Sequence, residues 1–138
     1  MDREAIVRNA DTYENWHFAE ANRVGRTVWV TGQRGYDERD QISQDATIQA
    51  RVAFRQLEKT LREAGASMDD IVSLTSYHVD MTSLEAFRGV KDEFIRAPYP
   101  TWTILGVAAL ASPEMLVAVD AVAVVGSGRH ATEHPRPH

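Results

Sequence analysis

The sequence predicts one α+β domain in which two helices pack on a single face of a β-sheet. Three observations support this prediction: helical spacing of apolar residues over 45–64, a second helical segment from 82, and an almost wholly apolar run at 116–125. Runs rich in β-branched and aromatic residues lie before and between these segments, as strands require. The chain has 138 residues, about the length of a domain with one core. We therefore expect layers of helix and sheet in one domain.

The composition is that of a globular protein, and it excludes several classes of partner and chemistry. Apolar residues make up 43% of the chain and charged residues 25%, as in average folded domains. A net charge of −5 gives no overall attraction to nucleic acid or anionic lipid. The absence of cysteine excludes disulfides and thiolate metal sites. Residues 1–8 are charged and no run could span a bilayer, so we expect a cytoplasmic protein without membrane or nucleic-acid partners.

The first predicted element is a β-hairpin over residues 16–31. The run 27–31 is β-branched and aromatic, and the segment 23–26, which contains Gly25, is typical of the turn before it. Gly32 and Gly35 follow closely. Glycines so spaced mark a place where the backbone takes unusual dihedral angles or approaches a ligand. We expect the strand to end in a loop there.

A long amphipathic helix is predicted from 45 to 64. Its apolar side chains recur at three and four residues, while charged side chains fall elsewhere on the helical wheel. These apolar positions are Ala50, Ala53, Phe54, Leu57, Leu61 and Ala64. Gly65 follows as a residue that readily forms a left-handed C-terminal cap. A strand is expected next, over 71–79.

A second helix is predicted to begin near Thr82. Thr82 and Glu85 have the spacing of a capping box, in which each side chain satisfies a backbone N–H at a helix start. Pro98 and Pro100 end the segment, because proline cannot donate to a helical ladder. Two final strands are expected, over 101–107 and 116–125.

The run 116–125 predicts a central strand with both faces covered, because it is almost wholly apolar. Two helices cover only one face of a sheet, so association of subunits is expected to cover the other. Residues 1–125 are therefore expected to form one domain. The segment 126–138 is rich in Gly, Ser, Arg, His and Pro, which predicts a disordered tail.

An ordered set of short motifs resembles the Rid family, also called YjgF or UK114. The motifs are VGR (24–26), TGQ (31–33), AGA (64–66), DDIV (69–72), VDM (79–81), PYPTWT (98–103), GVA (106–108) and VDAVA (119–123). The resemblance implies a chorismate-mutase-like fold of the bacillus type, assembled as a homotrimer with a cleft at each subunit interface. It also implies binding of small carboxylates, since archetypal members hydrolyse reactive enamines and imines to 2-oxo acids and ammonia.

Two catalytic residues of the archetypal members are missing. The arginine that grips the substrate carboxylate aligns with Trp102, and the glutamate that handles the attacking water aligns with Ala118. An asparagine of the family cleft aligns with Arg88, which suggests that the carboxylate-binding guanidinium has moved to the second helix. The PxWT stretch at 100–103 resembles a divergent branch of the family.

Several residues are candidates for the site, each with a structural alternative. Asp120 shares a strand face with Ala118 and is a candidate general acid or base, or else a structural carboxylate. His78 is a candidate proton shuttle in the cleft, or an ordinary strand histidine. By the resemblance, Thr31 and Gly32 belong to the pocket loop, and ordinary strand-end capping is the alternative.

Two aromatic residues are expected to shape the pocket. Phe18 aligns with the archetypal pocket tyrosine and would form a wall rather than donate a hydrogen bond. Trp102 would narrow the cleft and offer a stacking face, unless it belongs to the core. The histidines of the tail, such as His134, lack rigid surroundings, and no phosphate-binding motif is present. We expect neither a metal nor a cofactor.

The functional hypothesis is a Rid-like hydrolase or deaminase acting on small enamines, imines or related metabolites, with Arg88 and Asp120 as catalytic candidates. The alternative is a non-catalytic trimer that binds a small metabolite. A third hypothesis, the ribonuclease activity reported under older names for this family, is opposed by the net charge of −5.

Overall fold

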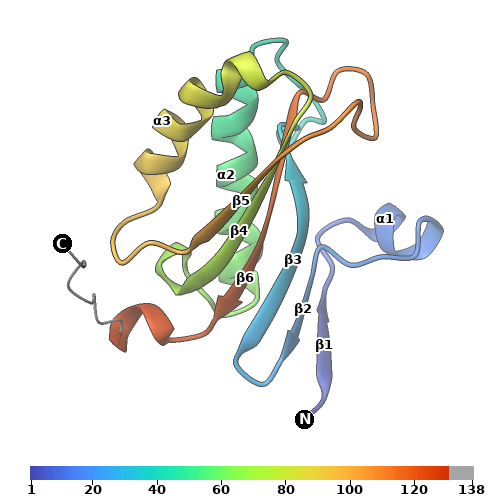
Figure 1. Cartoon of the computed structure of the whole chain (residues 1–138). Helices are drawn as coiled ribbons and strands as arrows, with labels where there is room; N and C mark the ends of the chain where they lie inside the picture. The colour runs from blue at the N-terminus through green and yellow to red at the C-terminus, as the bar shows by residue number, and fades with distance from the viewer. Residues whose placement is uncertain (131–138) are drawn as a thin grey trace, which may run out of the picture.

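A computed structural model describes residues 1–130 of the chain, and its centre is a six-stranded sheet (Figure 1). The strands lie in the order β1-β2-β3-β6-β4-β5, and all neighbours are antiparallel except β4 and β5. The strands are β1 (Arg3–Ile6), β2 (Ala21–Val24), β3 (Thr27–Arg34), β4 (Ile71–His78), β5 (Thr101–Gly106) and β6 (Val117–Val124). The helices are α1 (Ala10–Asn15), α2 (Ala46–Glu63) and α3 (Leu84–Phe94), and three short 3-10 helices cover Met68–Asp70, Met81–Ser83 and Ser127–His130.

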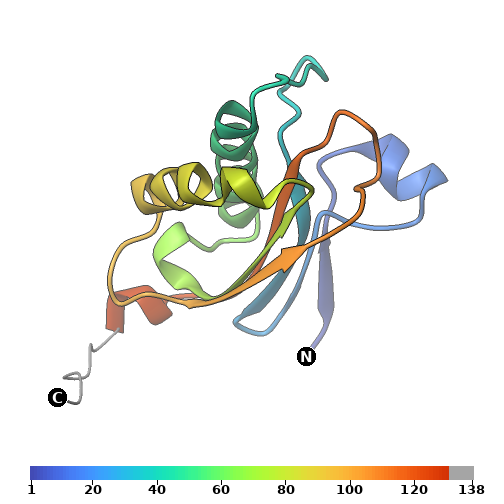
Figure 2. The ribbon, with the colours of Figure 1, turned by 45° about the horizontal axis from the view of Figure 1, so that its top comes forward.

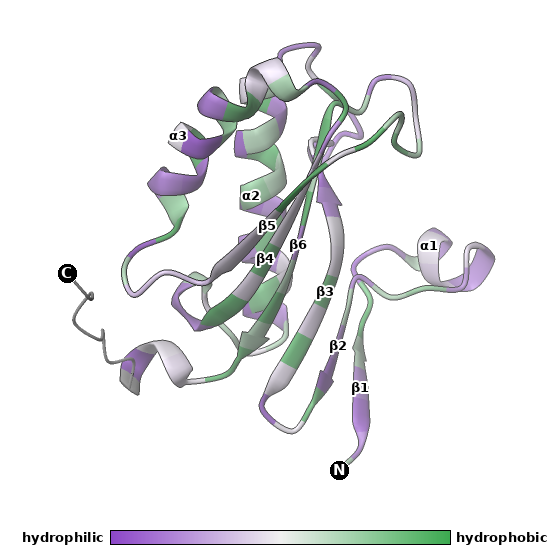
Figure 3. Ribbon diagram, viewed as in Figure 1, coloured by the Kyte–Doolittle hydropathy of each residue, from purple (hydrophilic) through white to green (hydrophobic). Residues whose placement is uncertain are grey.

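The predicted α+β architecture is confirmed, with α2 and α3 side by side on one face of the sheet (Figure 2). The core lies between these helices and the sheet, where apolar burial provides the main stabilisation. Phe54, Leu57, Leu61, Leu74, Phe87, Val90 and Val119 are buried there. The outward side of α3 is hydrophilic (Figure 3), as expected for a helix with one face in solvent.

The long helix begins and ends close to the predicted residues. Asp45 caps the start of α2, where its carboxylate accepts hydrogen bonds from the backbone N–H groups of Thr47 and Ile48 at 2.8 and 3.2 Å. Gly65 follows the last turn with a φ of 84°, the left-handed conformation that glycine adopts at least cost. The start of α3 differs from the prediction. Asp80, rather than a capping box at Thr82, accepts a bond from the Thr82 backbone N–H, within the 3-10 turn before the helix.

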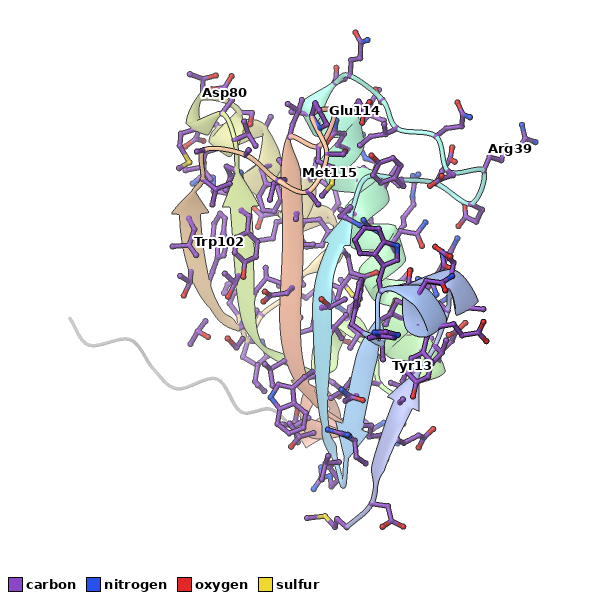
Figure 4. The ribbon with its side chains drawn as sticks, turned by 90° about the vertical axis from the view of Figure 1, so that its right-hand side faces the viewer. Tyr13, Arg39, Asp80, Trp102, Glu114 and Met115 are labelled. Atoms are coloured by element: carbon purple, nitrogen blue, oxygen red, sulfur yellow. The ribbon has the colours of Figure 1, made fainter. Side chains whose placement is uncertain are left out.

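Strand β6 is central, as predicted, but the chain by itself covers only one of its faces. On the helix side the side chains are buried, namely Val117, Val119, Ala121 and Ala123. On the other side Asp120, Val122 and Val124 are half-buried. We call this second side the bare face. Figure 4 views it from the front, with the helices behind the strands.

The beginning of the chain adds two elements that the sequence did not predict. Strand β1 pairs with β2 along the edge of the sheet, and α1 follows it. Strand β3 also differs, because it does not end at Gly32 but continues to Arg34 through an irregular pairing with β6.

The segment predicted as a tail begins with an ordered turn. Gly126 has a φ of 82°, and the backbone N–H of Gly128 donates to the Asp70 carboxylate at 3.0 Å. Residues 131–138, where most of the predicted disorder falls, lie outside the described residues. Within 1–130, no helix is both long and apolar enough to cross a membrane.

Candidate functional site

A cavity of about 890 Å³ lies on the bare face, toward the ends of β3 and β6 that face α1. Its walls come from β3, β4 and β6, from the segment 8–20 that includes α1, and from the loops 36–40 and 110–115. Figure 4 labels Tyr13 on α1, Arg39 on one loop and Met115 on the other, and of these three Met115 lines the cavity. Segments distant in sequence therefore converge on one hollow.

A β-bulge shapes the floor of the cavity. The register between β3 and β6 shifts between Val30 and Gln33. Two residues, Thr31 and Gly32, therefore lie opposite the single residue Asp120. All three residues line the cavity, so the bulge adds a hydroxyl and a backbone N–H beside the carboxylate.

Tyr77 and Asp120 form a hydrogen-bonded pair in this cavity. The hydroxyl of Tyr77 donates to Oδ2 of Asp120 at 2.6 Å, which is short and typical of a charge-assisted bond. This bond, together with burial, raises the pKa of Tyr77 to about 12. Tyr77 therefore stays protonated at neutral pH and holds one carboxylate oxygen. Within residues 1–130 the other oxygen, Oδ1, accepts no hydrogen bond, so it is available to a water molecule or a ligand.

The segment 8–20, which forms one wall of the cavity, is attached to α2 through hydrogen bonds of Arg8. Its guanidinium donates to Oγ1 of Thr60 at 2.9 Å, to Oε1 of Gln56 at 3.0 Å and to the Gln56 carbonyl at 3.2 Å. Its backbone N–H donates to the Glu20 carboxylate at 2.9 Å. Arg8 thus has a structural role, and most of its donors are already occupied.

A second arginine, Arg34 at the end of β3, also lines the cavity. Its guanidinium stands 5.5 Å from the ring centre of Tyr36, within the range of a cation–π contact. Tyr36 is itself held, because its hydroxyl lies 2.7 Å from Oγ of Ser112 and its carbonyl accepts from Nε2 of Gln56 at 3.1 Å. The ring is a fixed platform for Arg34.

Four of the residues predicted for the site line this cavity together. They are Phe18, Thr31, Gly32 and Asp120, and Ala118 lies beside them. Phe18 is 44% exposed, and its role as a wall stays a prediction. Separate segments of the sequence therefore meet at one place.

His78 and Trp102 lie on the helix-covered face and do not line the cavity. The Trp102 indole N–H donates to Oγ of Ser76 at 2.8 Å, and the same oxygen lies 2.8 Å from Nε2 of His78. His78 is fully buried, and burial lowers its pKa. Its Nδ1 has no hydrogen-bond partner among the described residues. Within one chain, His78 is therefore a buried strand histidine and Trp102 packs against the core, which were the structural alternatives for these two residues.

Arg88 also lies outside the cavity. It projects from the exposed side of α3, where its guanidinium pairs with Glu85 at 3.0 Å. The two helices separate it from the bare face of its own sheet. Within one subunit, therefore, Arg88 and Asp120 are not brought together.

Metal ligands are not gathered in the described part of the chain. Among residues 1–130, no group of three or more His, Asp and Glu side chains is placed to hold an ion. The cavity offers instead carboxylates, hydroxyls, backbone groups and two guanidinium groups, a set suited to an organic ligand with polar ends.

Among the polar cavity residues that were not predicted from the sequence, Arg8, Arg34 and Tyr77 matter most for the site. A signal existed for Tyr77, because it alternates with buried Ser76 and His78 and so must point to the opposite face. Arg34 carried no comparable signal, since its position depends on the bulge. The role of Arg8 depends on β1, whose four residues are mostly exposed.

Comparison with known proteins identifies the family and the fold independently of the cavity. A family profile described as Endoribonuclease L-PSP matches residues 11–125. The RutC family protein YjgH of Escherichia coli is 38% identical over 109 residues, covering 78% of this chain and 83% of that protein. A 2-iminobutanoate/2-iminopropanoate deaminase of Dermatophagoides farinae is 28% identical over 95 residues, covering 67% and 74%. The crystal structure of Rv2704 from Mycobacterium tuberculosis, a YjgF/YER057c/UK114 family member, superposes with a TM-score of 0.81 at 27% identity, covering 90% of this chain and all of that one.

Proposed function

Because the chain belongs to the endoribonuclease L-PSP family, the Rid or YjgF/UK114 family, we propose that it is a hydrolase of the enamine and imine deaminase type. Its substrates would be small reactive metabolites with a C=N bond, or the enamines that tautomerise to them. Relatives named 2-iminobutanoate/2-iminopropanoate deaminase support this reaction class. The cavity on the bare face is the proposed site.

The observation that carries the proposal is the Tyr77–Asp120 pair beside the bulge. Hydrolysis of an imine adds water to the C=N carbon, and the resulting carbinolamine expels ammonia to leave a carbonyl. In this proposal Oδ1 of Asp120 would accept the proton of the attacking water and return it to the departing nitrogen. Tyr77 would act on Asp120 as a positioning residue, because its hydroxyl fixes the other carboxylate oxygen.

The bulge residues have a complementary role in this proposal. The Thr31 hydroxyl and the backbone N–H of Gly32 would hold the oxygen that develops on the substrate carbon, since the Thr31 N–H already donates to the Glu20 carbonyl at 2.9 Å. Phe18 would exclude bulk water from one side of the cavity. Each role uses a residue that the cavity already contains.

We further propose that the protein is a homotrimer with a chorismate-mutase-like arrangement of subunits. The bare face carries large apolar side chains that remain 42–48% exposed in one chain, namely Trp29, Val72 and Leu105. Apolar surface of this extent favours burial against another subunit. The cavity opens on the same face, so a neighbouring copy would close it and could contribute residues such as Arg88.

The experiment described below distinguishes the proposed hydrolase from two other functions. A trimer that only binds a metabolite would use the same cavity without turnover. An action on RNA, which the family's description suggests, is opposed by the cavity rim, where Asp37, Glu38 and Asp40 repel a phosphate backbone.

The proposal is tested by ammonia release from 2-aminoacrylate generated freshly beside the purified protein. Wild-type protein should accelerate release above the spontaneous rate, and Asp120→Asn should lower kcat by about a hundredfold or more, the range for a general base. Asp2→Asn removes an exposed carboxylate outside the cavity and is the matched control. A rate equal to the spontaneous one for the wild-type protein, across several small enamines, would favour the binding protein.

A further inference from the structure

We infer that Arg34 is the residue that binds the carboxylate of the ligand in this cavity. The inference rests on the proposed function and deepens it, because it gives the substrate an acidic end and a fixed orientation. A guanidinium presents two parallel N–H donors that match the two oxygens of a carboxylate. The cavity lining of one chain contains two arginines, Arg8 and Arg34, and the choice between them follows from their contacts.

Arg8 is already used by the protein. Its guanidinium nitrogens donate to Gln56 and Thr60, and Nε lies 3.9 Å from the Glu63 carboxylate. A ligand would have to displace several of these bonds and detach the segment 8–20 from α2. Arg34, by contrast, makes no ion pair and donates no side-chain hydrogen bond within residues 1–130.

The position of Arg34 is nevertheless fixed. Its backbone belongs to β3, where it lies opposite Ala118 of β6. The guanidinium rests near the face of Tyr36, which Ser112 and Gln56 hold in place. A guanidinium over a ring keeps its N–H edge free for an acceptor in the plane of the group. The donors are therefore oriented before a ligand arrives.

None of the acidic side chains that line the cavity, namely Glu20, Asp37, Glu38, Asp40 and Asp120, forms an ion pair with this guanidinium within residues 1–130. Ala118, directly opposite Arg34 on β6, carries no charge that could pair with it. Glu38 pairs with Lys59, Glu20 accepts from the Arg8 backbone, and the Asp37 carboxylate accepts from two backbone N–H groups of its own turn. These contacts leave Arg34 as the guanidinium available to an acid.

The spacing along the strands suits a small 2-imino acid. Asp120 lies two residues beyond Ala118 on β6, which is about 7 Å of strand. The ligand, rather than the Arg34 side chain, would bridge this distance, because the guanidinium is held at the Tyr36 ring. A ligand with its carboxylate on Arg34 would then present its C=N carbon to Asp120 and Thr31, the residues proposed for the chemical step.

The test is calorimetric titration of the purified protein with 2-oxobutanoate and with its uncharged amide, 2-oxobutanamide. For Arg34→Gln, affinity for the acid should fall by about tenfold or more, as expected from losing a charge-assisted bidentate bond. Affinity for the amide should change less than about twofold, because the amide lacks the carboxylate charge that Arg34 would bind. Arg34→Lys keeps the positive charge but loses the two parallel N–H donors, so its affinity for the acid should lie between those of wild type and Arg34→Gln. Arg62→Gln, an exposed arginine of α2 outside the cavity, is the matched control.

Three results would overturn the inference. They are unchanged affinity of Arg34→Gln for the acid, an equal loss for acid and amide, and the absence of acid binding by the wild-type protein. If Arg88→Gln lost acid binding while Arg34→Gln kept it, the carboxylate of the ligand would be bound by Arg88 on α3 instead. Binding is measured without turnover, so a wild-type protein that binds the acid through Arg34 but releases no ammonia would refute only the proposed hydrolysis.

Discussion

The hydroxyl of Tyr77 lies 2.6 Å from Oδ2 of Asp120, although 43 positions separate the two residues in the sequence. Tyr77 stands on β4 and Asp120 on β6, and both side chains project from the bare face into the cavity. The pair occurs where β3 bulges, so one place combines a positioned carboxylate with hydroxyl and backbone donors. The proposed chemistry depends on this meeting of three strands.

Asp120→Asn should lower the pKa of Tyr77 from about 12 toward the ordinary value near 10, because the carboxylate raises it through the hydrogen bond and its charge. The raised pKa means that the pair stabilises the wild-type fold fully below pH 10, and that this contribution is lost as pH rises toward 12. Ultraviolet titration of tyrosinate measures the pKa. Tyr77→Phe identifies which tyrosine is observed, and identical curves for wild type and Asp120→Asn would contradict the pair.

Acid should weaken the fold through His78. Burial lowers the pKa of this imidazole below 6.5, so its neutral form contributes stability that is present above pH 6.5 and lost as pH falls toward the folded-state pKa. His78→Leu should therefore show a smaller loss of unfolding free energy on acidification. Urea denaturation at several pH values measures the slope. His17→Gln, at an exposed position, should keep the wild-type slope, and an unchanged slope in His78→Leu would contradict this account.

The hydrogen bond from Trp102 to Ser76 should be measurable as coupling. Ser76→Ala should cost about 1–3 kcal/mol, because it leaves the indole N–H and the buried imidazole without their shared partner. Trp102→Phe should also destabilise, through the lost bond and the lost contact area. The double variant should cost less than the sum of the two, since both remove the same bond. Strict additivity in urea denaturation would show that the bond contributes nothing.

Gly35 permits a close approach between the end of β3 and α2. A Cβ at this position would stand 2.8 Å from Cα of Gln49, so Gly35→Ala should cost about 1–3 kcal/mol in unfolding free energy. Gln49 in turn holds the loop that borders the cavity, through bonds of 2.8 and 2.9 Å to the backbone at Glu114 and Leu116. The control is Gly89→Ala on α3.

The control substitution should have the opposite sign. Nothing lies within 4 Å of a Cβ at Gly89, and alanine in an exposed helical position stabilises by about 0.5–1 kcal/mol over glycine. Thermal or urea denaturation of Gly35→Ala and Gly89→Ala measures the change in unfolding free energy for each variant. Equal effects of the two substitutions would mean that the contact with Gln49 is not a constraint.

The regular elements could be predicted because their signals are local. The helical period over 45–64 and the apolar run over 116–125 each encode a burial pattern within one segment, and both elements formed where predicted. The fold class followed from their order. Strand β1 gave no such signal, because its four residues are mostly exposed and it exists through pairing with β2.

The site was predictable only in part, because its geometry depends on relations between strands. Strand periodicity placed Asp120 on the face of Ala118, and the family resemblance placed Thr31 in the pocket loop. The bulge that sets Thr31 and Gly32 opposite Asp120 depends on how β3 pairs with β6, and an alternating sequence does not reveal it. Likewise, Arg34 reaches its platform because Ser112, 76 positions beyond Tyr36, holds the ring. Arg88 looked suitable by alignment, yet its place on α3 directs it to solvent within the single chain.

The proposed site requires a second subunit over the bare face, where Trp29 and Leu105 are exposed. Sedimentation equilibrium of the purified protein tests this directly. It should give a mass three times the 15.4 kDa of one chain, and Trp29→Glu should shift the mass toward that of a single chain while Ile48→Glu, at an exposed residue of α2, should not. A wild-type protein that stays at the mass of one chain at micromolar concentration would contradict the closed intersubunit cavity.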